Sequence, residues 1–252
     1  RRLLYCGEWI ESHALHVYLL HAPDYLGYDD AIALARDHPE VVKQGLALKK
    51  AGNAIVAVLG GREIHPVNVR VGGFHRAPTG RELQSLVPDL EAALDIAQKT
   101  VALVAGFDCP VLDRDYELVA LRHPHEYAVC EGRIVSTHGL DFPAPEFERH
   151  LEEQQVPHSH ALQAQVRGRG AYLTGPLARV VLNGEQLHPL ARQALREAGL
   201  DASCRNPFRS IVARAVELVH ACEEALRVIR HYEPPARAAI ASARRVRDRR
   251  VA

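Results

Sequence analysis

The opening segment of the chain, residues 1–21, constrains the fold most, because it is apolar and yet carries many ionisable side chains. An α-helix places residues three and four apart on one face. An unpartnered buried polar group costs about 1–3 kcal/mol, so we expect specific polar partners for the imidazoles on this face. Histidines satisfied inside a core are the commoner case, and spacing alone leaves a core role and a site role open. The stripe comprises Cys6, Trp9, Ile10, His13, His16, Val17 and Leu20.

Composition and charge are those of an ordinary soluble globular protein. Of the 252 residues, 47% are hydrophobic and 25% are charged, which allows one large core or two small ones. Lys plus Arg and Asp plus Glu both number 31, so net charge favours neither a nucleic-acid nor a membrane partner. No uninterrupted apolar run reaches the roughly 18 to 20 residues of a membrane span.

Two features predict an internal fragment of a cytoplasmic protein. The chain starts at Arg1 inside a helical pattern that has no cap, and it contains no Met. No secretory signal precedes the cysteines, and no two of them form a CxxC pair. An odd, scattered set favours reduced thiols over a disulfide framework. The five cysteines are Cys6, Cys109, Cys130, Cys204 and Cys222.

Helical patterns account for most of the chain, so we expect a mainly α fold. Pro23 and Gly27 predict a turn over residues 22–27. Thr79 has capping-box spacing with a glutamate, and Pro88 predicts a break or kink in the helix that follows. Besides the opening helix, the predicted helices cover residues 28–37, 39–60, 79–106, 146–155, 188–198 and 206–231.

The middle of the chain, about residues 113–183, predicts a small β insertion. Strands are expected over residues 116–121 and 127–135. Histidines are frequent in this stretch, but they have neither the spacing of zinc ligands nor a cysteine pair beside them, which argues against a zinc site. These histidines are His123, His125, His138, His150, His158 and His160.

The loop at residues 60–73 is flanked by glycine pairs and carries Arg62, Glu63 and His65. Paired glycines permit unusual backbone angles or a close approach of the chain. Valine at every second position from 67 to 71 predicts a short strand. A functional loop and a plain charged surface loop are both compatible with this pattern.

Gly175 and Pro176 give a turn signal inside an apolar stretch that also contains Arg179. A lone guanidinium in such a setting needs a carboxylate or a cluster of acceptors. The sequence therefore predicts an acidic partner for Arg179 elsewhere in the chain.

The last segment, residues 238–252, is a basic tail with almost no apolar periodicity. We interpret it as a disordered or out-of-frame terminus rather than a nucleic-acid-binding tail, because the rest of the chain is neutral.

Three stretches together resemble the large (alpha) subunit of nickel-iron hydrogenases, most closely the cytoplasmic NAD(P)-coupled or sulfhydrogenase-like branch. They are Gly7–His16, Gly60–Pro66 followed by Val71–Gly73, and Tyr172–Arg179. The resemblance covers about residues 1–237, which it identifies as the central part of a single large-subunit domain. It implies a helical bundle with a small β portion.

The resemblance also implies an activity, a cofactor and partners. The family oxidises hydrogen reversibly at a nickel-iron centre whose iron carries cyanide and carbon monoxide. Its four cysteine ligands come from two CxxC pairs, and this chain has neither pair. We therefore expect the fragment alone to be inactive and to bind no such cofactor. The implied partners are an iron-sulfur small subunit, NAD(P)-reducing flavoprotein subunits and further iron-sulfur subunits, with hydrogen as substrate.

By the family pattern, this chain supplies the surroundings of the metal centre and no catalytic residue. Ser12, His13 and His16 would line the site on the opening helix. Uptake-type members often have Asp-His where this chain has Ser-His. The same pattern places a loop near the site, and it assigns a structural motif to a third stretch. These residues are Arg62, Glu63 and His65 in the loop, and Gly175, Pro176 and Arg179 in the motif.

A non-catalytic relative of the same fold is the second possibility. The quinone-site subunit of respiratory complex I shares this fold without nickel and without the cysteines. The sequences Gly61–Pro66 and Gly175–Arg179 favour the hydrogenase.

Overall fold

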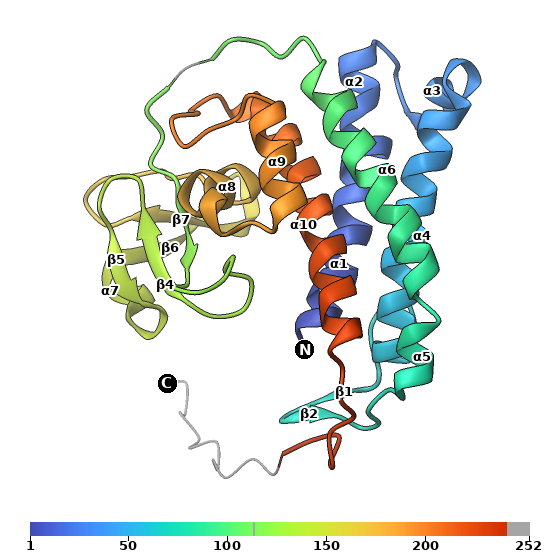
Figure 1. Ribbon diagram of the computed structural model, residues 1–252. Helices are drawn as coiled ribbons and strands as arrows, with labels where there is room; N and C mark the ends of the chain where they lie inside the picture. Colours follow the sequence, from blue (N-terminus) through green and yellow to red (C-terminus); the bar gives the residue numbers. More distant parts are fainter. Residues whose placement is uncertain (113, 241–252) are drawn as a thin grey trace.

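The computed structural model describes residues 1–112 and 114–240, in which four long helices lie side by side (Figure 1). Helix α1 contacts α4 and α10, and α6 contacts the same two helices, so the four close into a ring. Their apolar faces form one large hydrophobic core. The mainly α fold class is therefore confirmed. The four helices are α1 (Arg2–Leu15), α4 (Pro39–Gly60), α6 (Val87–Ala105) and α10 (Ser210–Arg230).

The opening helix is longer than predicted, and its geometry changes along its length. Helix α1 passes into a π-helical turn, η1 (His16–His21), and then into α2 (Ala22–Leu26). The predicted turn over residues 22–27 is therefore mostly helix, because Pro23 lies in the first turn of α2, where it needs no N–H partner. Gly27, with φ of 79°, ends the helix.

The π-helical turn also alters the predicted apolar stripe. Ile10, His13 and Val17 are buried as expected, whereas Leu20 is 58% exposed. Leu20 lies inside η1, and because a π-turn holds more residues than an α-turn, its side chain rotates away from the original face.

The other helices of the bundle follow the sequence pattern closely. Helix α3 (Ala31–Asp37) begins at Asp30, whose side chain accepts a hydrogen bond of 2.7 Å from the Ala33 N–H. Helix α5 (Gly80–Gln84) has the predicted capping box between Thr79 and Glu82. Helix α6 starts anew at Val87, so the break predicted from Pro88 is present.

Glycines let α1 and α4 approach to backbone contact. A Cβ atom on Gly52 would lie 2.5 Å from the Glu11 backbone nitrogen and 2.7 Å from the Gly7 carbonyl oxygen. A Cβ on Gly45 would lie 2.5 Å from the Tyr18 Cβ. Residue numbers fall along α4 as they rise along α1, so the two helices are antiparallel.

The predicted β part lies to one side of the bundle (Figure 1). It contains a three-stranded antiparallel sheet in the order β3–β4–β5 and a hairpin of β6 and β7. A small separate cluster of buried side chains supports it. The elements are β3 (Val119–Arg122), β4 (Arg133–Ser136), β5 (Asp141–Pro143), η2 (Ala144–Glu146), α7 (Phe147–His150), β6 (Leu151–Val156) and β7 (Ser159–Val166).

Two predictions in this region were wrong in part. The helix expected over residues 146–155 ends at His150, and β6 follows, because pairing with β7 satisfies its backbone groups. The strand expected over residues 127–135 begins only at Arg133. Tyr127 is instead buried against the bundle.

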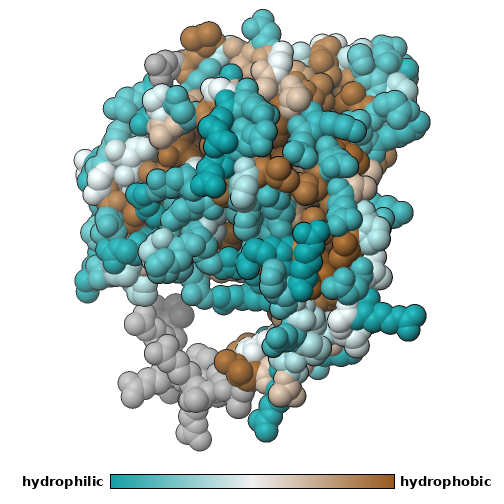
Figure 2. All heavy atoms as spheres, viewed as in Figure 1, coloured by the Kyte–Doolittle hydropathy of each residue, from teal (hydrophilic) through white to brown (hydrophobic). Residues whose placement is uncertain are grey.

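The remaining elements connect these parts. The predicted strand near residues 67–71 is β1 (Val69–Arg70), paired with β2 (Gly73–Phe74). The chain then supplies α8 (Pro176–Asn183), η3 (Gly184–Gln186), α9 (Pro189–Glu197) and η4 (Pro207–Arg209). On the face shown in Figure 2 hydrophilic residues predominate, with hydrophobic residues in separate patches.

The start of the basic tail pairs with β2, since the Phe74 N–H donates to the Ala238 carbonyl and the Ile240 N–H to the Gly72 carbonyl. The rest of the predicted tail, residues 241–252, lies outside the described residues. In the part of the chain that the structure describes, no helix combines the length and hydrophobicity that a membrane crossing needs.

Candidate functional site

A fully buried carboxylate, Glu217, lies at the centre of the contacts between α1, α8 and α10. Its Oε1 atom accepts hydrogen bonds from the Tyr127 hydroxyl at 2.7 Å and from Arg179 Nε at 2.6 Å. Its Oε2 atom accepts from Arg179 Nη2 at 2.7 Å and lies 2.7 Å from His13 Nε2. These four contacts fill the acceptor positions of the carboxylate. Arg179 thus meets the acidic partner that its apolar setting predicted.

The protonation of this centre follows from its contacts. Burial alone would raise the pKa of Glu217, but hydrogen bonds from Arg179 and His13 hold it well below its usual range. Burial lowers the pKa of His13, although Glu217 opposes this shift. Glu217 is therefore an anion that remains ionised near neutral pH.

Trp9 covers the ionic centre from α1. Its ring stacks on the His13 imidazole, with centroids 5.5 Å apart, and the Arg179 guanidinium carbon lies 4.6 Å from its centroid. The Tyr127 ring meets it edge-on. A cation over an aromatic face adds attraction that grows when water is excluded. These contacts hold Trp9, and with it α1, against Arg179 on α8.

Gly175 and Pro176 position Arg179 for this contact. Gly175 adopts φ of 102°, a region that favours glycine, and Pro176 occupies the first turn of α8. Arg179 then points from the first turn of α8 toward α10. The three residues of the predicted structural motif thus act through the geometry of one helix start.

A second group of polar residues continues the centre toward the surface. His220 is buried, and its ring lies 4.8 Å from that of Tyr127 and 4.7 Å from that of His188. His188 Nε2 lies 2.7 Å from Glu224, which also receives two hydrogen bonds from Arg227. Burial and the neighbouring His188 lower the pKa of His220 to about 3. These residues line a polar pocket of about 390 Å³.

The residues predicted to line the site on α1 occupy different environments. His13 is buried in the ionic centre. Ser12 is exposed, and its hydroxyl lies 3.5 Å from His13 Nδ1. His16 is half-buried in η1, where burial, with Arg214 and His21, lowers its pKa to about 4. Ser12 therefore lies at the protein surface beside the buried His13, and the role of these residues in lining a site stays a prediction.

The loop residues Arg62, Glu63 and His65 are exposed beyond the end of α4. Arg62 Nε donates to the His65 carbonyl at 2.6 Å, and His65 has φ of 54°. Glu63 accepts a hydrogen bond of 3.3 Å from the Asn53 side chain, so the loop folds back against α4. The structure does not bring it together with His13, and its role beside the site stays a prediction.

The buried cysteines of the described residues do not fit the donor set of a nickel-iron centre. Cys6 and Cys222 are buried, and burial raises the pKa of both thiols, that of Cys222 to about 12. Thiolates bind such metals, so two buried neutral thiols are poor ligands. Across residues 1–112 and 114–240, no three His, Cys, Asp or Glu side chains converge in a metal-binding group. The six histidines between residues 123 and 160 belong to no such group in this part of the chain.

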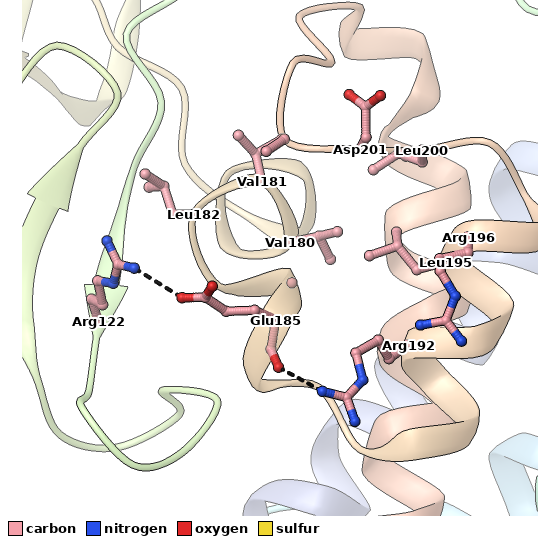
Figure 3. Close-up of a pocket in the computed structure, with 12 residues that line it drawn as sticks. Arg122, Val180, Val181, Leu182, Glu185, Arg192, Leu195, Arg196, Leu200 and Asp201 are labelled. Atoms are coloured by element: carbon pink, nitrogen blue, oxygen red, sulfur yellow. Dashed lines mark hydrogen bonds and ion pairs between the residues drawn. The ribbon is translucent and has the colours of Figure 1, made fainter.

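A separate surface pocket of about 540 Å³ lies between α8 and α9 (Figure 3). Glu185 links its sides, since it pairs with Arg122 at 3.0 Å while its carbonyl accepts from Arg192 at 3.2 Å. Apolar side chains of both helices form the floor. No sequence pattern indicated this pocket.

Sequence reasoning missed Glu217, His220 and Glu224, although a signal for them existed. All three fall three to four residues apart in the otherwise apolar helix that was predicted over 206–231. Polar residues at that spacing share a helix face. Inside an apolar stripe they predict a buried polar network, as the histidines of α1 did.

Known proteins of similar sequence match most of this chain. No protein-family model matches it. It is 32% identical to the alpha subunit of sulfhydrogenase 1 from Pyrococcus furiosus, over 90% of this chain and 53% of that protein. It is 30% identical to a subunit of the vhu F420-non-reducing hydrogenase of Methanocaldococcus jannaschii, over 89% of this chain and 60% of that protein.

Solved structures agree with these relatives on the fold. An NAD+-reducing NiFe-hydrogenase in its H2-reduced state matches with a TM-score of 0.80 at 21% identity, over 92% of this chain and 57% of that chain. The chain thus spans between half and two thirds of the length of the proteins it matches. The resemblance read from the sequence is confirmed.

Proposed function

We propose, on the premise that this chain is a homologue of hydrogenase alpha subunits with the fold of a nickel-iron large subunit, that it forms the central part of such a catalytic subunit. The complete subunit would oxidise hydrogen reversibly to protons and electrons. Residues 1–237 would belong to one large-subunit domain, with the β part as an insertion.

The observation that carries this proposal is the anchoring of α1 by Glu217. Three hydrogen-bonding side chains, from α1, α8 and the loop before β4, converge on one buried carboxylate. Residues that line a reactive centre must be positioned to within a fraction of an ångström. Hydrogen-bonded side chains packed behind them provide this rigidity. Ser12 and His16, which flank the anchored His13, would then face the reacting centre.

The metal itself would be held by residues other than those described. Where bound, a nickel-iron centre with its cyanide and carbon monoxide ligands supplies the chemistry of hydrogen cleavage. The role proposed for this chain is to orient and enclose: His13 holds α1 against α10, and Ser12 offers a hydroxyl at the edge of the wall. Such outer residues tune a metal site by hydrogen bonding.

The proposed partners are an iron-sulfur small subunit, NAD(P)-reducing flavoprotein subunits and further iron-sulfur subunits, in the cytoplasm. Support comes from relatives that are themselves subunits of multi-subunit hydrogenases, and from the NAD+-reducing hydrogenase of similar fold.

The test is to purify the protein that contains this chain with its partner subunits, and to measure nickel content together with hydrogen-dependent reduction of a viologen dye and of NAD(P). We expect one nickel per copy of the protein, together with hydrogen-dependent reduction of both acceptors. A complex that contains no nickel and reduces neither acceptor, but that transfers electrons to a quinone, would favour the complex I-like alternative instead.

A further inference from the structure

The π-helical turn η1 carries two imidazoles in close contact. The ring centroids of His16 and His21 lie 5.1 Å apart, and the two planes are perpendicular. The Nδ1 atom of each ring is buried without a hydrogen-bond partner among residues 1–112 and 114–240. Buried polar atoms are normally paired, and single π-turns are frequent at functional sites. We therefore expect a hydrogen-bonding partner for these two imidazoles.

Arg214 on α10 faces the same place and is in the same condition. Its Nε atom is buried and has no partner in the part of the chain that the structure describes. After burial, Arg214 is the next cause that lowers the pKa of His16, and it acts in the same direction on His21. Helix α10 contacts η1, so the Arg214 guanidinium and the two imidazoles lie in one region of the fold.

The carboxylates nearby do not fill this role. Glu217 lies one turn after Arg214, but Arg179, His13 and Tyr127 already occupy all its acceptor positions. Asp24 raises the pKa of His21, yet it is exposed and its side chain forms no hydrogen bond to another described residue. Leaving a guanidinium partly buried and unpaired is costly.

We propose that His16, His21 and Arg214 form a binding site for a carboxylate, supplied by a free small molecule or by a side chain from another polypeptide segment. A carboxylate is planar, accepts up to four hydrogen bonds and pairs with a guanidinium through two of them. Its charge offsets that of the Arg214 guanidinium, and a neutral imidazole can donate its ring N–H to it. Bound there, it ties η1 to α10 directly behind the wall formed by α1.

The direct test is a density map of the purified protein in its natural complex, at a resolution that separates a carboxylate from a water molecule. We expect a planar carboxylate within hydrogen-bonding distance of the Arg214 guanidinium and of at least one imidazole. Density that is continuous with a protein side chain identifies a carboxylate from another polypeptide segment. Separate density identifies a free small molecule. Water alone between these three side chains would overturn the proposal.

Thermal unfolding checks the same site in solution. If the carboxylate is a free molecule, saturating sodium formate should raise Tm by about 2–4 °C relative to sodium chloride at equal ionic strength. Arg214→Gln should abolish this difference, and Arg192→Gln, an exposed arginine elsewhere, should keep it. If a protein side chain fills the site, changing it to its amide should lower Tm in the wild type and much less in Arg214→Gln. Equal responses of wild type and Arg214→Gln would contradict the proposal in either case.

Discussion

Arg179 and Glu217 form a bidentate ion pair inside the protein, with Nε–Oε1 and Nη2–Oε2 distances of 2.6 and 2.7 Å. The Glu217 side chain is fully buried, and that of Arg179 is 22% exposed. Planar, two-bond contact of this kind fixes orientation as well as distance. The pair therefore joins α8 to α10, and through His13 it also joins α1.

Glu217→Gln should destabilise the protein by about 3–5 kcal/mol, because Arg179 would stay buried without its counter-charge. The free energy of unfolding from urea denaturation measures this. The matched control is Glu185→Gln, which removes an exposed partner of Arg122 and should cost at most about 1 kcal/mol. Similar losses in the two variants would contradict a special role for the buried pair.

Gly52→Ala should destabilise the contact between α1 and α4 by about 1–3 kcal/mol, since the added methyl group would meet backbone atoms of Glu11 and Gly7 that cannot move separately. Gly80→Ala is the matched control. A Cβ at Gly80 meets no atom within 4 Å, and its backbone is helical, so the change should be neutral or slightly stabilising. Equal effects in the two variants would refute the close helix packing.

Acid should weaken the fold before any buried carboxylate is protonated. Burial lowers the pKa of His220 to about 3, so between pH 6.5 and 3 the unfolded chain binds a proton that the folded protein excludes. The contribution of His220 to stability is therefore full above pH 6.5 and falls as the pH decreases, by up to about 1.4 kcal/mol per pH unit.

Urea denaturation at pH values from 7.5 to 5.0 tests this dependence. His220→Gln should reduce the slope by the contribution of one proton, because the glutamine cannot take it up, while His13 and His16 keep theirs. His231→Gln changes an exposed histidine and should leave the slope as in the wild type. An unchanged slope in His220→Gln would show that this ring does not control the acid response.

Cys6→Ser and Cys222→Ser should leave the nickel content of the purified protein unchanged. Both thiols are buried and kept neutral by burial, which makes them poor metal ligands. Elemental analysis of nickel per protein measures this. A loss of nickel in either variant, with the fold intact by circular dichroism, would assign that cysteine to the metal site after all.

The sequence predicted most helices well, because their caps and apolar periods agree. Helix α4 has the predicted bounds, and the capping box at Thr79 starts α5. Prediction from local sequence failed where contacts between distant segments determine the secondary structure. Strand β6 is rich in Glu and Gln, which suit a helix, and only its pairing with β7 makes it a strand.

The candidate site was predictable only in part. The opening helix and the need of Arg179 for a carboxylate followed from spacing and burial. The identity of the partner did not, because Glu217 is 38 residues away from Arg179 in the chain. The placement of the loop around Arg62 depends on the antiparallel packing of α1 and α4, which no local pattern specifies. Its proposed role beside the site, like the division into one domain and a tail, stays a prediction.

The infrared spectrum of the purified protein tests the central claim most directly, namely that this chain is the wall of a nickel-iron site. Cyanide and carbon monoxide bound to iron absorb where proteins do not. We predict such bands in the wild type, and shifted bands in Ser12→Ala, because Ser12 lies at the edge of the anchored wall. Arg192→Gln, far from α1, should leave them in place. A wild-type spectrum without these bands would contradict the account.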